Sequence, residues 1–156
     1  MASPASIAGH PIHPMLIPFP IGLWSFSLIA DLIYLWRNNP IWHDWIAFYT
    51  LLAGIIGAVL AALFGIIDWL SLKDSAVVKI ANWHARLNVI ALLVFAASFY
   101  LRTASGARMV NGSFIIPLLL SVFGVILISI SGYLGGELVF RHGVAVETSN
   151  NAARTR

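Results

Sequence analysis

Four long apolar runs alternate with short polar segments along the chain. The runs cover residues 15–36, 45–72, 87–101 and 114–140, and the first is interrupted by Pro18, Pro20 and Asp31. About 20 consecutive apolar residues form a helix that crosses the ~30 Å hydrocarbon core of a bilayer. Three runs reach that length by themselves, and the third reaches it if its helix begins near Asn82. The pattern therefore predicts four transmembrane helices.

The segments between these runs are short, at residues 37–44, 73–81 and 102–113. Backbone groups inside lipid must be hydrogen-bonded within their own segment, which excludes open strands. Short connections also make consecutive helices antiparallel neighbours. We therefore predict an all-α fold, an integral membrane antiparallel four-helix bundle over residues 1–146. The polar stretch 147–156 is predicted to be a disordered tail, and the sequence shows no evident internal repeat.

Composition points to the same class of protein. Of the 156 residues, 60% are hydrophobic and 10% are charged, whereas an average soluble domain carries roughly 25% charged residues. The chain has no cysteine, so thiolate metal sites and iron–sulfur clusters are excluded within it. Any metal or cofactor that it holds must use His, Asp, Glu, Met or Tyr.

The distribution of Lys and Arg predicts the orientation of the bundle. The end with both termini and the second loop carries six of them, and the opposite end carries Arg37, Arg102 and Arg108; the six are Lys73, Lys79, Arg86, Arg141, Arg154 and Arg156. This bias predicts a multi-pass protein of the bacterial inner membrane with both termini in the cytoplasm. The basic residues are spread over loop ends rather than gathered on one face, so no nucleic-acid partner is expected.

Ionisable residues gather at the end of the bundle that carries the termini. Because the helices alternate in direction, six ionisable residues share this end: His10, His13, Asp68, His84, Glu137 and His142. Among the histidines, only His43 lies at the other end. An ionisable residue at the edge of a membrane span is costly enough to indicate a functional site. Separate interfacial roles remain open, with Glu137 paired to Arg141 and Asp68 paired to Lys73 or Arg86.

Small residues form a stripe along the second span, at spacings of three and four. They are Gly54, Gly57, Ala58, Ala61, Ala62 and Gly65. Such a stripe permits close contact between helices, and it would equally let a flat macrocycle lie against the backbone. Gly132, Gly135 and Gly136 create similar space in the fourth span, beside the polar residues.

Three segments together resemble one known family. HPIHPMLIPFPIG begins at His10, NWHARLN surrounds His84, and SGYLGGELVFRHGVAV runs to Val146. They resemble the bacterial membrane family called domain of unknown function 2231, over about residues 9–146. Its members are similar in having four spans. Fusion of some members to Rieske-type or cytochrome-type redox domains implies a role in membrane electron transfer.

Two functional hypotheses follow from these residues. The first is a small b-type haem protein for electron transfer, with His13 and His84 facing each other from the diagonal spans one and three. His10 and His142 would form a second site or bind propionates, and Arg86 and Arg141 are the natural propionate partners. A redox partner protein, a quinone or a second copy of the chain would accompany the surrounding lipid.

The second hypothesis is a non-haem zinc or iron site, or a subunit for proton or ion transport. Its mixed nitrogen and oxygen ligands would be His13, Asp68, His84, Glu137 and His142. No pair of these residues has the tight spacing of a known metal motif. A structural role, in which the polar residues only order the bundle, also remains open, and the sequence does not decide whether the protein is an enzyme.

Overall fold

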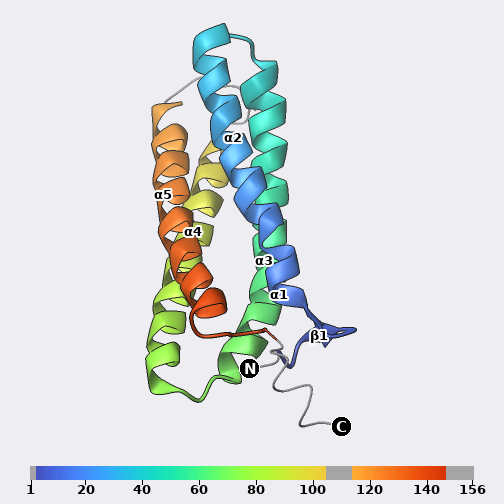
Figure 1. Ribbon diagram of the computed structural model, residues 1–156. Coiled ribbons are helices and arrows are strands. Elements are labelled where there is room, and N and C mark those ends of the chain that lie inside the picture. Colours follow the sequence, from blue (N-terminus) through green and yellow to red (C-terminus); the bar gives the residue numbers. More distant parts are fainter. Residues whose placement is uncertain (1–2, 105–113, 147–156) are drawn as a thin grey trace.

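The computed structural model describes residues 3–104 and 114–146. Four helical segments make up almost all of this part, and each is long and apolar enough to cross a membrane. Figure 1 shows them running alternately up and down an elongated bundle. The segments are α1 (Ile12–Leu16) with α2 (Pro18–Arg37), η1 (Ile41–Ala47) with α3 (Phe48–Leu70), α4 (Ser75–Ala104) and α5 (Ile115–Phe140). The predicted helical membrane bundle is confirmed.

The third helix is longer than its apolar run. It begins at Ser75 rather than near Asn82, because the carboxylate of Asp74 accepts hydrogen bonds from the backbone N–H groups of Ala76 and Val77 at 2.8 and 3.2 Å. A side chain that caps the first turn in this way stabilises a helix start. At its other end the helix includes Arg102, which the apolar pattern predicted to lie in a loop.

A short hairpin precedes the first helix and was not predicted. Strand β1 (Ser6–Ile7) pairs antiparallel with β2 (His10–Pro11), and Ala8 and Gly9 make the turn with positive φ angles of 50° and 77°. Two consecutive residues of that conformation are typical of the tightest hairpin turns. The predicted tail at 147–156 lies outside the described residues.

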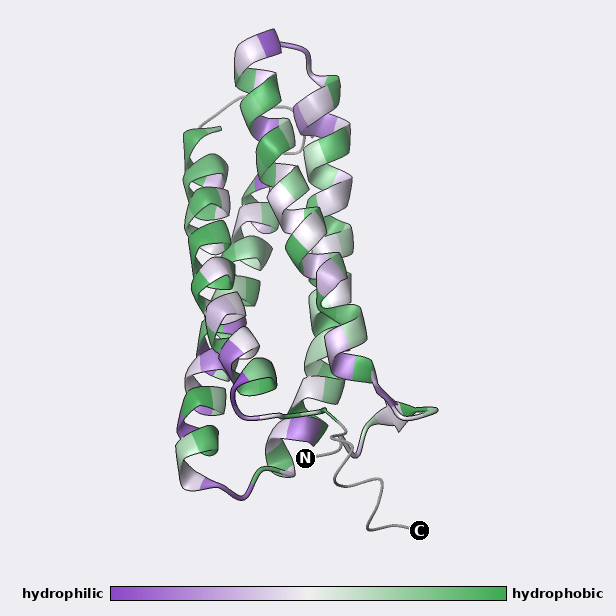
Figure 2. Cartoon of the chain, viewed as in Figure 1, coloured by the Kyte–Doolittle hydropathy of each residue, from purple (hydrophilic) through white to green (hydrophobic). Residues whose placement is uncertain are grey.

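The outer surface of the bundle is apolar. Figure 2 shows hydrophobic residues along the helices and strongly hydrophilic ones mainly near the ends. Large side chains such as Leu63, Leu93, Leu119 and Ile126 are exposed. A surface of this kind would aggregate in water, whereas it is the expected lipid-facing surface of a helix bundle.

The two halves of the bundle repeat each other. Residues of α1 and α2 correspond to residues of α4 that lie 71 positions later, as Asp31 corresponds to Arg102. Trp24 and Phe95 are such a pair, and their rings stack with centroids 4.1 Å apart. Each of these rings lies against a glycine of the next helix, Gly54 or Gly124.

Two serines extend this correspondence. Ser27 donates a hydrogen bond to the carbonyl of Ala47, and Ser98 donates one to the carbonyl of Pro117. Equivalent side chains of α2 and α4 meet in the middle of the bundle, so the halves are related by an approximate two-fold axis along it. The repeat is not evident in the sequence because few of the matched positions carry identical residues.

Candidate functional site

His13 connects the first helical segment to the third helix. It is the second residue of α1, and its Nδ1 lies 2.8 Å from the backbone carbonyl oxygen of Ala61 in α3. The imidazole lies directly over Gly65, where an added Cβ would come within 2.7 Å of the ring carbon Cε1. Glycine at this position therefore makes room for the histidine.

His84 makes the equivalent contact in the second half. Its Nδ1 lies 2.8 Å from the backbone carbonyl oxygen of Ser131 in α5, and the Ser131 hydroxyl donates a hydrogen bond of 3.2 Å to the carbonyl of His84. A Cβ added at Gly135 would lie 3.0 Å from the His84 ring. In both halves the glycine stands four residues after the carbonyl that accepts from the histidine.

The two imidazoles meet between the halves of the bundle. Their centroids are 6.5 Å apart and their planes are inclined at 85°. Because each Nδ1 donates its proton to a carbonyl, each Nε2 carries the lone pair of the neutral ring. The side-chain amide of Asn88 lies 3.0 Å from the Nε2 of His84, and it donates a hydrogen bond to that lone pair.

The other predicted histidines lie apart from this pair. His10 is exposed on the hairpin, with its Nδ1 2.9 Å from the carbonyl oxygen of Ala8, and His142 is exposed just after α5. The predicted cluster of four histidines is therefore reduced to two.

The predicted carboxylates and arginines have local partners. Asp68 accepts a hydrogen bond of 2.5 Å from Ser3, and the described part of the chain contains no ion pair from Asp68 to Lys73 or Arg86. The other three have partners close by in the sequence. Arg141, just after α5, forms a 3.2 Å ion pair with Glu137, and the guanidinium of Arg86 lies 5.4 Å from the centroid of the Trp83 ring.

The predicted five-residue metal set is not assembled. Among residues 3–104 and 114–146, no three His, Asp or Glu side chains are placed to hold a metal ion together. Of the five, only His13 and His84 approach each other. Four of these side chains belong to different helical segments and His142 follows α5, and sequence order alone shows at which end each one lies but not which way it faces.

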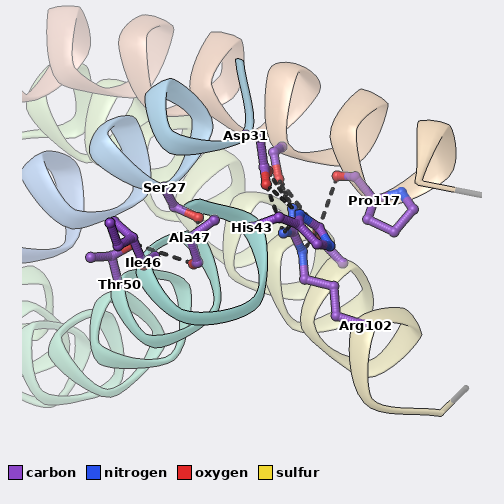
Figure 3. Close-up of polar contacts among 10 residues, drawn as sticks. Ser27, Asp31, His43, Ile46, Ala47, Thr50, Arg102 and Pro117 are labelled. Carbon is purple, nitrogen blue, oxygen red and sulfur yellow. Dashed lines mark hydrogen bonds and ion pairs between the residues drawn. The ribbon is translucent and has the colours of Figure 1, made fainter. Parts of the chain in front are cut away.

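A second polar cluster lies at the opposite end of the bundle and was missed. Figure 3 shows Asp31, His43 and Arg102 converging from α2, η1 and α4. Arg102 donates to both carboxylate oxygens of Asp31, at 3.0 and 2.6 Å. Asp31, an aspartate within the first apolar run, was the available signal in the sequence. Its partner Arg102 was missed because the third apolar run ends one residue earlier, at Leu101.

These features define a multi-pass helical membrane protein whose two halves meet at buried or half-buried polar side chains. A sequence model for the family described as "Predicted membrane protein (DUF2231)" matches residues 9–148, so the chain belongs to this family. This confirms the resemblance seen in the three sequence segments. No curated protein matches the chain, and no solved structure matches it.

Proposed function

We propose that His13 and His84 are the axial ligands of a b-type haem and that the protein is a membrane electron carrier. The observation that carries this proposal is the 6.5 Å separation of the two ring centroids. A metal bound about 2 Å from one nitrogen of each imidazole would hold two opposed rings with centroids roughly 6 Å apart. The pair thus has the spacing of two ligands on opposite faces of one metal.

The hydrogen bonds of the pair support the same role. Histidine ligands commonly donate their second ring N–H to a carbonyl or carboxylate, which fixes the tautomer and makes the ligating nitrogen more basic. His13 and His84 both do so, at 2.8 Å. The carbonyl acceptors belong to α3 and α5, so each ring is oriented by a helix other than its own.

The number of protein ligands favours haem over a bare ion. Structural zinc needs four ligands, and catalytic zinc needs three from the protein. The described residues offer two neighbouring imidazoles and no group of three metal-binding side chains. A porphyrin supplies four nitrogens itself, so two axial histidines complete its iron.

Two basic residues are proposed to pair with the propionates. Arg86 is exposed on α4, two residues after His84, and would have to leave its contact with Trp83 to reach a propionate; Arg141 follows the last turn of α5. Arg141 already pairs with Glu137, and its side chain is 71% exposed, so a propionate would replace the glutamate as its partner. Charge-assisted hydrogen bonds of this type are among the stronger ones in proteins.

Haem binding by ligand variants tests the proposal. The chain would be expressed with added haem precursor, purified in detergent and titrated with haem, and the Soret band would be measured. We expect His13→Ala and His84→Ala each to lose or strongly shift that band, because each removes one axial nitrogen. His142→Ala is the matched control and should keep the wild-type spectrum, since this side chain is exposed beyond α5. Equal spectra for all three variants would contradict the ligand assignment.

A further inference from the structure

The second polar cluster, at the end of the bundle opposite the histidine pair, is buried. Asp31 is 0% exposed, His43 is 4% exposed and Arg102 is 6% exposed. Arg102 and Asp31 occupy equivalent positions in the two halves, so their bidentate ion pair joins the halves across the two-fold axis. The Arg102 guanidinium is also within 3.3 Å of the Ser121 hydroxyl of α5. Buried charges near a membrane are retained mainly where they serve a function.

One atom in this cluster has two partners with opposite requirements. The Nδ1 of His43 lies 2.8 Å from a carboxylate oxygen of Asp31 and 3.2 Å from a guanidinium nitrogen of Arg102. The carboxylate only accepts hydrogen bonds, so it requires a proton on Nδ1. The guanidinium only donates, so it requires a bare lone pair there. The same positions of the heavy atoms therefore suit His43 both with and without a hydrogen on Nδ1.

We propose that this cluster is a proton-binding site, in which His43 takes up a proton at Nδ1 and exchanges Arg102 for Asp31 as its hydrogen-bond partner. In the neutral state Nδ1 accepts from Arg102 and Nε2 carries the hydrogen. The incoming proton bonds to the Nδ1 lone pair and gives an imidazolium that donates to Asp31. Arg102 keeps its two hydrogen bonds to the Asp31 carboxylate, so the exchange needs no movement of a helix.

Two carboxylates and one guanidinium surround His43. Asp31 and Arg102 face the ring from α2 and α4, and the carboxyl group of Asp44 is buried beside it in η1. Tyr34 of α2 packs on the ring at 5.3 Å, and Phe114, at the start of α5, packs on it at 4.8 Å. With both carboxylates ionised and Arg102 charged, the cluster has one excess negative charge, and a proton on His43 neutralises it.

The backbone around His43 also differs from an ordinary helix. Residues Ile41–Ala47 form a π-helix, which continues directly into α3. Such turns are rare and often occur at functional sites. Here the π-helix carries both His43 and Asp44 toward the interior, where both are buried. The proposed ligand of this site is the proton alone, because the described residues contain no group of three metal-binding side chains.

Nitrogen NMR of protein labelled with ¹⁵N-histidine tests this site directly. The ring shifts distinguish the two neutral tautomers from the imidazolium, and a His43→Gln variant identifies the His43 signals. In the folded wild type we expect His43 to pass from the neutral ring to the imidazolium as the pH is lowered over the range in which the protein stays folded. A ring that keeps one charge and one tautomer over this range would overturn the proposal and leave the cluster as a structural ion pair.

Two variants should change the proton affinity in opposite directions. Asp31→Asn removes the acceptor of the protonated form and should weaken proton binding by about tenfold or more, whereas Arg102→Gln removes the neighbouring cation and should strengthen it by a similar factor. Glu137→Gln, at the other end of the bundle, should leave His43 unchanged. Shifts of the same sign in the first two variants would contradict the partner exchange. If either variant fails to fold, the wild-type titration decides by itself, and it requires no bound haem.

Discussion

The histidines of the two polar clusters differ in which ring nitrogen keeps a free lone pair. His13 and His84 donate from Nδ1 and keep a lone pair on Nε2, which suits a metal ligand. His43 instead has a donor and an acceptor competing for one nitrogen, which suits a proton. The same residue type thus has two different proposed roles, determined by its neighbours rather than by its depth in the bundle.

Asn88 offers a prediction about the ligand atom. Its amide donates to the lone pair of His84 that iron would take, so it must give up this hydrogen bond when haem binds. We expect Asn88→Ala to raise the haem affinity by up to about tenfold, since a net hydrogen bond contributes ~1 kcal/mol. Haem titration in detergent measures this. Asn82→Ala is the matched control on the same helix, because Asn82 accepts from the Trp69 indole instead, and a loss of haem affinity in Asn88→Ala alone would contradict the assignment of Nε2.

At the scale of the elements, close packing explains the stripe of small residues on α3. A Cβ at Gly54 would lie 2.5 Å from the Trp24 ring, and one at Gly57 would lie 3.4 Å from the ring of Pro20. The stripe therefore lies against α1 and α2 for most of its length, and Ala62 alone among its residues is exposed. The same surface of α3 thus packs against α1 and α2 and, at Gly65, leaves room for the His13 ring.

Gly57→Leu tests this packing. The larger side chain should separate α3 from Pro20 and lower the free energy of unfolding by about 1–3 kcal/mol, the usual cost of overpacking. Thermal unfolding of the purified protein in detergent measures the change. Ala62→Leu introduces the same side chain on the lipid-facing side of the same helix and should leave the unfolding temperature close to the wild-type value. Equal unfolding temperatures for both variants would show that Gly57 makes no structural contact.

The elements also show what the sequence could and could not predict. Apolar length was enough to find four helices, since lipid leaves few other folds. It could not place the start of α4, where Lys79, Asn82 and Arg86 are polar and the Asp74 cap determines the first turn. The meeting of His13 and His84 followed from their diagonal helices, whereas the partner of Asp31 was hidden because Arg102 stood just beyond an apolar run.

At the scale of the whole molecule, the approximate two-fold axis relates the two proposed sites. His13 meets its equivalent His84, and the rings of Trp24 and Phe95 stack midway along the bundle. Asp31 meets its equivalent Arg102. The axis thus relates two histidines at one end and two opposite charges at the other. Both haem binding and proton binding would hold the two halves together.

The buried ion pair of Asp31 and Arg102 also bears on the predicted orientation of the bundle in the membrane. Arg102 is neutralised by Asp31 inside the bundle, so it no longer counts among the free basic residues at its end. Only Arg37 and Arg108 then oppose the six Lys and Arg residues at the other end, which strengthens the expectation of cytoplasmic termini. A fluorescent or phosphatase reporter fused after Arg156 should therefore read as cytoplasmic. A periplasmic signal from this fusion would show that the orientation is reversed.

The proposed haem iron between His13 and His84 can be detected by a haem titration followed by ferric EPR spectroscopy. Wild-type protein purified in detergent should bind one haem per chain and give a low-spin spectrum, because two imidazoles are strong axial ligands. The near-perpendicular planes of the two rings, inclined at 85°, should make that EPR signal strongly anisotropic. A protein that is colourless after haem-supplemented expression and binds no haem on titration would contradict the account.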